Sequence, residues 1–421
     1  MSKTNASGWN WSGIGLLVLV NLVATSFLFS PGTGDVSIWD TWMREIYGYG
    51  LIGGFAHSGT DYPPLAFVIL ALVGRCAQAF GTTPLLVLKC SLLLFLFATT
   101  GCFYWFSRNL ILTAALEFSL ILNSVALGYL DIYFAPFLIA GFLLLSRQHL
   151  NAGLLFYAIS CAIKWQPLIL APFVCLYVLN AASERVSGAQ PVKKFCITPF
   201  AISALFVVIP ILVVFPVPTV FDSFRRAMTY HKFLSGYALN LAWIQTWALH
   251  LLQPDKYGAL QNGAIDIFIV REPLVVWPAK ILFYLSYATV LLVFARQRKT
   301  FQRLIIYSML GYLAYFSFNT GVHENHLFLV CCLAWILVFL EPGQLLRCLN
   351  FSVAANANLF LFYGVFGQRL NPVIAGVDIT LLFAVANLCL FGGFLLHTLK
   401  TDHVGLKFWQ ANRPRPLDEA N

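Results

Sequence analysis

Long apolar segments recur from one end of the chain to the other, separated by short connections that hold most of the charged residues. Crossing the hydrocarbon core of a bilayer takes about 20 apolar residues of helix, and fewer where a helix is tilted or buried. Helices are the expected spanning element because lipid offers the backbone no hydrogen-bond partner. The pattern predicts twelve transmembrane helices, at 12–30, 84–106, 110–123, 132–146, 152–163, 167–180, 196–216, 274–295, 303–319, 326–340, 349–367 and 374–397.

Two longer polar stretches, 31–83 and 217–273, interrupt this series. Within the first, residues 65–80 are apolar, but polar residues such as Arg75 break the pattern. A helix with such a polar patch is expected to lie in the membrane interface rather than to cross it. The prediction is an all-α polytopic membrane protein, a single integral domain over 1–421, with two exterior loops of which the first carries interfacial helices.

The composition agrees with this interpretation. Hydrophobic residues make up 59% of the chain and charged residues only 10%, whereas about a quarter of a soluble protein is charged. The formal charge of +9 does not indicate a nucleic-acid partner, because no soluble segment carries a basic stripe with interleaved aromatic residues. The ten cysteines are scattered without metal-type spacing, so they are expected to be small core residues.

The short loops predict the orientation, because Lys and Arg are enriched on the cytoplasmic side of membrane proteins. With the N-terminus in the cytoplasm, that side receives Arg147, the basic cluster at 296–303, Arg347 and the C-terminal tail. The opposite side receives the acidic first loop and all of 217–273. Counting 65–80 as a spanning helix would reverse the later loops, so the positive-inside rule supports its interfacial assignment.

With this topology, several polar motifs converge on the non-cytoplasmic face. Ionisable residues that gather on one side of a membrane protein are candidates for function. The motifs are Gly34-Asp35, Asp61-Tyr62-Pro63-Pro64, Asp131, Lys164-Trp165-Gln166-Pro167 and His323-Glu324-Asn325-His326. The second exterior loop adds a basic group of Arg225, Arg226, His231 and Lys232.

The order of these motifs resembles that of the C-type (GT-C) membrane glycosyltransferases. The matching segments are Gly34-Asp35 with Trp42-Met43, Asp61-Tyr62-Pro63-Pro64-Leu65, Lys164-x-Gln166 before Ala171-Pro172, and Val322-His323-Glu324. The chain looks most like the dolichyl-phosphate-glucose glucosyltransferases of N-glycan assembly, with the mannosyltransferases of lipid-anchor synthesis as related enzymes. Asn325 stands where those glucosyltransferases usually carry Lys.

The resemblance implies a GT-C fold and a hexosyltransferase whose donor is a polyprenyl-phosphate sugar and whose acceptor is a hydroxyl of a glycan or glycolipid. It also implies that Asp35 matches the proposed catalytic base and that His323 lies near the donor phosphate. The chemistry agrees, because the lipid phosphate is already a good leaving group. The enzyme then needs a carboxylate to take the acceptor's proton and cations to hold the developing phosphate charge. One carboxylate base, with no nucleophilic carboxylate opposite it, implies inversion at the anomeric carbon.

These arguments assign Asp35 as the catalytic base. The expected substrate-binding residues are Asp61, Tyr62, Asp131, Lys164, Gln166, Arg225, Arg226, His231, Lys232, His323, Glu324 and His326. Lys164, His323 and the exterior basic group are the candidate phosphate-binding cations, and exterior aromatics, including Trp39, Trp42 and Trp243, are candidates for stacking on sugars. No cofactor or metal is expected, since the chain has no Asp-x-Asp motif.

Two other functions stay open. A lipid-linked sugar flippase or transporter would place ionisable residues at mid-membrane on broken helices, in two similar halves, whereas the charges here lie at the exterior ends. A lipid-linked glycan polymerase or ligase shares the long exterior loop but acts on a lipid pyrophosphate and typically relies on exterior arginines. The compact loops favour a bacterial inner membrane over the endoplasmic reticulum, with the active site on the non-cytoplasmic side and membrane lipids around the protein.

Overall fold

The computed structural model describes residues 11–186, 197–229, 232–270 and 272–411. Within these ranges nearly every ordered element is a helix, and the strands are four segments of two residues each. The helices are mostly apolar, and several are long enough to cross a bilayer. The chain is therefore an all-α membrane protein, which confirms the predicted class.

Within the described residues, a helical segment occupies each of the twelve apolar ranges. They are α1 with η1 (Trp11–Ser26, Phe27–Phe29), α4 (Pro84–Ser107), α5 with η2 (Leu110–Ile121, Leu122–Ala126), η3 with α6 (Leu130–Tyr133, Ala135–Ser146), α7 (Leu150–Ile163), η4 with α8 (Gln166–Leu170, Ala171–Val186), α9 with η5 and α10 (Thr198–Ser203, Ala204–Val208, Ile209–Val214), α14 (Pro273–Arg296), α15 (Phe301–Phe318), η6 with α16 (Glu324–Leu327, Phe328–Leu340), η7 with α17 (Pro342–Gln344, Leu345–Tyr363) and α18 (Thr380–Ala411). By length and composition, five helices in the described part of the chain are suited to crossing a membrane, or six if α9–α10 and α11 form one bent span.

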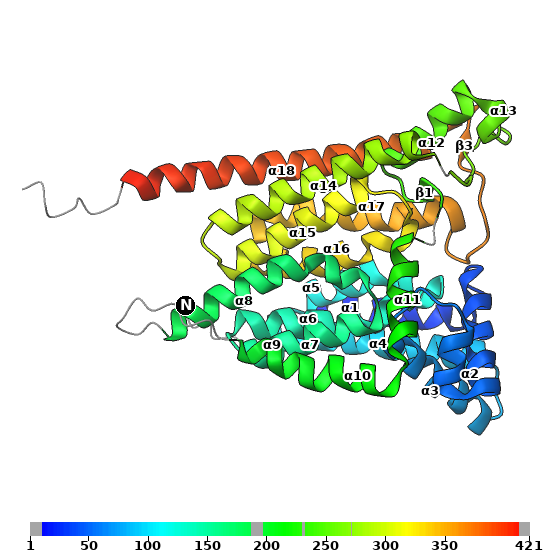
Figure 1. The fold of residues 1–421 in the computed structure, drawn as a ribbon, viewed down its shortest axis with the longest axis horizontal. Helices are drawn as coiled ribbons and strands as arrows, with labels where there is room; N and C mark the ends of the chain where they lie inside the picture. The colour runs from blue at the N-terminus through cyan, green and yellow to red at the C-terminus, as the bar shows by residue number, and fades with distance from the viewer. Residues whose placement is uncertain (1–10, 187–196, 230–231, 271, 412–421) are drawn as a thin grey trace, which may run out of the picture.

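The remaining elements gather at one end of the helix bundle, called the capped end below (Figure 1). They are α2 (Asp35–His57), α3 (Pro64–Ala79), α11 (Val217–Thr229), β1 (Ser235–Gly236), α12 (Leu241–Leu252), α13 (Pro254–Tyr257), β2 (Val322–His323), β3 (Val373–Ile374) and β4 (Val377–Asp378). Helices α1 and α4 to α10 form one half of the bundle and α14 to α18 the other, while α11 runs across the capped end (Figure 1).

Helix α11 lies at 105° to the preceding α9–α10 helix. The turn occurs because Phe215 adopts an extended conformation before Pro216, as residues that precede proline prefer. One face of α11 packs inward: the Phe224 ring lies edge-on to Trp165, 5.2 Å between centroids. The other face is exposed and includes Phe221 and Met228. The 217–273 stretch thus carries helices of its own.

The last helix begins at Thr380 rather than at 374 as the apolar pattern predicts. Residues 373–378 instead form a hairpin of β3 and β4, because Ala375 and Gly376 have positive φ angles of 51° and 80°. Asp378 then caps α18 by accepting the Thr380 N–H at 2.9 Å, and it also accepts the Ile265 N–H at 2.9 Å. The sequence pattern does not separate this short apolar hairpin from the helix that follows, so the predicted helix begins too early.

The capped end and the link between α14 and α15 lie at opposite ends of the bundle (Figure 1). Single cysteines at Tyr47 and Lys256, both in elements of the capped end, should therefore react with an impermeant thiol reagent from one side of a sealed vesicle. A cysteine at Arg298, in the α14–α15 link, should react only from the other side. The background lacks the exposed native cysteines Cys76, Cys90 and Cys389. Labelling of Arg298→Cys and Lys256→Cys from the same side would contradict this arrangement.

Candidate functional site

Asp35 is placed by a tight turn between the first two helices. After η1 the chain passes through Gly32, whose φ of +77° favours glycine, and the Thr33 N–H donates to Leu127 O at 2.9 Å. Asp35 is then the first residue of α2. A helix N-terminus carries partial positive charge, which favours a carboxylate there. The turn thus presents the Asp35 side chain at the capped end, half-buried.

A second segment, 122–131, receives that turn. Helix α5 ends in the wider turn η2, and the chain then passes through Gly128 with a φ of +82° into η3. The Trp39 indole N–H donates to Gly128 O at 3.0 Å, and the Ser30 hydroxyl donates to Ala126 O at 2.8 Å. The beginning of α2 is therefore held against 122–131 by side chains on both sides of Asp35.

Asp131, at the end of this segment, is wholly excluded from solvent. Lys164 Nζ, just after α7, lies 2.8 Å from Asp131 Oδ2, and the Asn325 amide donates to the same oxygen at 2.9 Å. The Lys164 ammonium also lies 5.1 Å from the centre of the Tyr62 ring, close enough for a cation–π contact. Residues from both halves of the bundle thus meet at one buried carboxylate.

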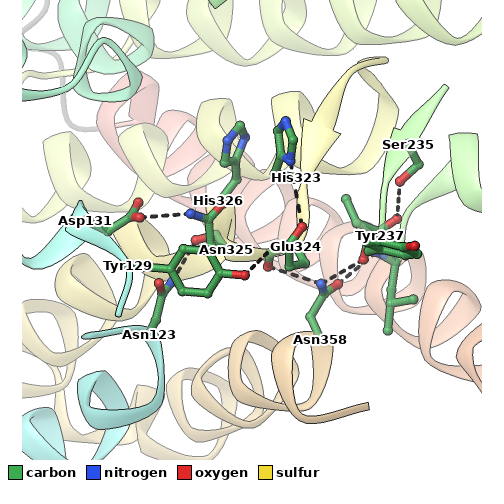
Figure 2. Close-up of polar contacts among 12 residues, drawn as sticks. Asn123, Tyr129, Asp131, Ser235, Tyr237, His323, Glu324, Asn325, His326 and Asn358 are labelled. Atoms are coloured by element: carbon green, nitrogen blue, oxygen red, sulfur yellow. Dashed lines mark hydrogen bonds and ion pairs between the residues drawn. The ribbon is translucent and has the colours of Figure 1, made fainter. Parts of the chain in front are cut away.

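The loop 323–326 is held from several sides (Figure 2). Strand β2 pairs in parallel with β1, which places Gly236 beside His323. Glu324 accepts a hydrogen bond from the Tyr129 hydroxyl, and its backbone oxygen accepts from the Asn358 amide at 3.1 Å. These contacts leave Glu324 buried, with its carboxylate 3.8 Å from His323 Nδ1.

Two half-exposed imidazoles project from this loop on the same side (Figure 2). The His323 and His326 rings are 5.5 Å apart between centroids. His326 stacks on Tyr315, whose hydroxyl lies 3.0 Å from His326 Nδ1. The pair is suited to donating N–H groups to one anion.

Opposing charges act on the Asp35 carboxyl. Burial, together with the negative charge of Glu324, raises its pKa to about 6, against the positive charges of His323 and Lys164. For His323, burial lowers the pKa, but the hydrogen bond and charge of Glu324 outweigh it, so the net direction is upward. At neutral pH, Asp35 is therefore ionised yet more basic than an ordinary aspartate, beside an imidazole inclined to carry positive charge.

The other predicted substrate-binding residues form two groups: Asp61, Tyr62 and Gln166, and the basic residues of the 217–273 stretch. Asp61 and Tyr62 belong to the cluster: the charge of Asp61 acts on both His323 and the Tyr62 phenol. Gln166 is buried behind Lys164, and its amide has no hydrogen-bond partner among the described residues.

Two basic residues of the 217–273 stretch have partners of their own. On α11, Arg225 pairs with Asp222 at 2.9 Å on the exposed surface, and Arg226 donates to Gly59 O at 3.0 Å. Lys232 is exposed, and His231 lies outside the described residues. The described contacts therefore do not gather these side chains at the carboxylates. Arg226 instead fastens α11 to the end of α2.

Three aromatic residues predicted to stack on sugars belong to the protein interior. Trp39 and Trp42 are 2% and 7% exposed and pack edge-on to each other and to Tyr62. Trp243 is fully buried, and its indole N–H donates to the Thr380 hydroxyl at 2.8 Å. The Trp rings pack inside the protein, because their large apolar faces are better buried among side chains than exposed.

Several residues of the cluster do not stand out in the sequence. Tyr129, Tyr315 and Asn358 are each one polar residue within or beside an apolar segment, and only tertiary contacts identify them. Lys89 is different, because a charged residue inside the apolar segment 84–106 is itself a signal of function.

Within the described part of the chain, no group of three or more His, Cys, Asp and Glu side chains is arranged to hold a metal ion. No protein-family model matches the chain, and no curated protein sequence matches it. The family resemblance therefore rests on the motifs and their placement.

The buried pair of Asp131 and Lys164 generates a stability prediction. Lys164→Met should lower the free energy of unfolding by about 3–5 kcal/mol, because it leaves an uncompensated buried carboxylate. The double variant Asp131→Asn/Lys164→Met should recover much of that loss, since neither charge then remains. Denaturant unfolding in a fixed detergent measures both. If the two substitutions were simply additive, the pair would not be coupled as the geometry requires.

Proposed function

We propose that this chain is an inverting glycosyltransferase of the GT-C type, which moves a hexose from a polyprenyl-phosphate donor to a hydroxyl of a glycan or glycolipid. The proposal rests mainly on Asp35, a half-buried carboxylate with a raised pKa at the first residue of α2 in the capped end. The neighbouring imidazoles supply the complementary charge. The motif order in the sequence supports the same assignment.

In this mechanism Asp35 accepts the proton of the acceptor hydroxyl as its oxygen attacks the anomeric carbon. The bond from that carbon to the lipid phosphate oxygen breaks at the same time, and its electron pair leaves with the phosphate. His323 and His326 donate N–H groups to the phosphate oxygens, where negative charge develops. Attack from the face opposite the departing phosphate inverts the anomeric centre.

The geometry suggests a division of roles. Lys164, whose ammonium is bonded to Asp131, organises the site rather than cradling the phosphate directly. Glu324 raises the basicity of Asp35 and favours the charged form of His323. Asp61 and Tyr62 line the approach to the acceptor side. Gln166, Arg226, His231 and Lys232 are assigned to peripheral substrate contacts, whereas Arg225, which pairs with Asp222 on the surface, is not.

The proposed setting is a membrane crossed by all twelve helical segments, with α2, α3 and α11 at the non-cytoplasmic face. A polyprenyl phosphate anchored in that bilayer presents its phosphate near headgroup depth, the level expected for the capped end. The positive-inside arrangement of the short loops supports this orientation, and their compactness favours a bacterial inner membrane.

Asp35→Asn should lower turnover by about 10²- to 10⁴-fold, the range for a lost general base. The fold should survive. Because the folded state raises the pKa of Asp35, it disfavours the ionised carboxylate, so the neutral amide should raise the unfolding temperature at pH 7.5. Single-turnover assays on the purified protein, with thermal unfolding alongside, test both points. Near-native turnover by Asp35→Asn would refute the assignment.

The pH dependence of kcat/KM provides a second test. A base must be ionised to act, so the rate should rise with pH and level off above about 6, the pKa of Asp35. An ordinary aspartate, with a pKa of about 4, would place that acidic limb about two units lower. A profile that stays flat from pH 7 down to 5 would be inconsistent with Asp35 as the base.

His323→Ala should raise KM for the lipid donor and lower the corresponding kcat/KM by about tenfold or more, through the loss of a charged donor to the phosphate. Thermal stability should change little, since the ring is half-exposed. Arg225→Ala is a suitable control, because its guanidinium pairs with Asp222 on the surface. If His323→Ala lowered stability alone and left donor kinetics per folded molecule intact, the residue would be structural.

A further inference from the structure

Lys89 lies in the second turn of α4 and is fully buried. Its ammonium donates to Val125 O at 2.5 Å, to Ala126 O at 2.9 Å and to the Ser30 hydroxyl oxygen at 3.0 Å. An ammonium has three N–H donors, so this set of acceptors is complete. No carboxylate within the described ranges lies at ion-pair distance from it. The neutral oxygens of two separate chain segments are its partners.

A buried ammonium without a counter-ion is costly. Part of that cost is offset here, because Val125 and Ala126 belong to the carbonyl end of the α5–η2 helix, where the helix dipole places partial negative charge. A methionine or leucine would fill the same space on α4 without any such cost. Unlike those residues, a lysine connects the two chain segments to which it donates hydrogen bonds.

Those two segments carry the acidic residues of the site. Ser30 immediately precedes the turn that presents Asp35, and Val125–Ala126 immediately precede the turn that leads through Gly128 to Asp131. A Cβ atom added to Gly128 would lie only 3.8 Å from Lys89 Nζ, so the second turn passes directly over the ammonium. Lys89 is therefore the point at which α4 holds both turns.

We propose that Lys89 is a positioning residue for the glycosyl transfer: through Ser30 and the Val125 and Ala126 carbonyls, it sets the distance between Asp35 and the buried Asp131 cluster. This inference rests on the proposed function. Its importance follows from geometry, since a displacement of about 1 Å in a reacting group can cost about 100-fold in rate. Lys89 does not touch substrate, and its effect is exerted through the position of the Asp35 carboxylate.

The principal variant is Lys89→Met, which keeps the length of the side chain and removes its donors. It should lower kcat per folded molecule by about 10- to 100-fold while KM for donor and acceptor stays within about twofold. Ser30→Ala, which removes a single acceptor, should lower kcat severalfold and serves if Lys89→Met does not fold. Thr99→Val is the matched control: its buried hydroxyl, on the same helix, donates to Phe95 O within α4, so kcat should be unchanged.

A double variant tests whether Lys89 acts through Asp35. In Asp35→Glu, whose carboxylate is already displaced, adding Lys89→Met should cost far less than it does in the native protein. Multiplicative losses would overturn the route through Asp35, as would a native kcat in folded Lys89→Met or, should that variant not fold, in Ser30→Ala. If any of these outcomes occurs while Asp35→Asn is inactive, the role of Lys89 is refuted and the proposed function is not. Full activity of Asp35→Asn would instead defeat the proposed function itself.

Discussion

The Asp131 carboxylate has no access to solvent, and the rest of the site depends on how that charge is compensated. Burying an ion is costly unless another charge and well-placed hydrogen bonds replace its water. The replacements come from distant parts of the chain, Lys164 in one half of the bundle and Asn325 in the other. Compensating this carboxylate at its Oδ2 oxygen therefore fixes the two halves relative to each other. It also fixes the neighbours of Asn325, so the His323 and His326 imidazoles and the Glu324 carboxylate have defined positions.

The same arrangement explains why the Asp35 carboxyl differs from a surface aspartate. Burial removes water from its surroundings, and Glu324, held by Tyr129, adds a like charge. Both effects favour the protonated form and so increase the basicity of the ionised form. The protein tolerates this repulsion because Asp35 sits at a helix N-terminus and on a turn held by Lys89 and the 122–131 segment. Functional groups commonly lower the stability of the folded protein in this way.

The sequence predicted the helical class, the twelve apolar segments and the gathering of most polar motifs at one end of the bundle. It did so because apolar length and loop charge are local properties. Counting spans was enough to place Asp35, Asp131, Lys164 and His323 at one end. The burial of a side chain and the identity of its bonding partners depend on the tertiary structure. The pattern therefore could not show that Trp39 and Trp243 are core residues or that Arg225 pairs with Asp222. Nor could it show that Tyr129 and Asn358 hold Glu324. The pattern placed the start of α18 too early, because the β3–β4 hairpin is mostly apolar, like the helix that follows it.

Inverting transfer from a lipid monophosphate sugar can be distinguished from its alternatives by the donor consumed and the linkage formed. The purified protein, reconstituted with a panel of glycan and glycolipid acceptors, is given hexoses on polyprenyl monophosphate and on polyprenyl pyrophosphate, each of known anomeric configuration. Nuclear magnetic resonance of the product then reports the new linkage. Only the monophosphate donor should be consumed, with release of polyprenyl phosphate and formation of a glycosidic bond of opposite anomeric configuration. Consumption of the pyrophosphate donor alone, or a product with retained configuration, would contradict this mechanism.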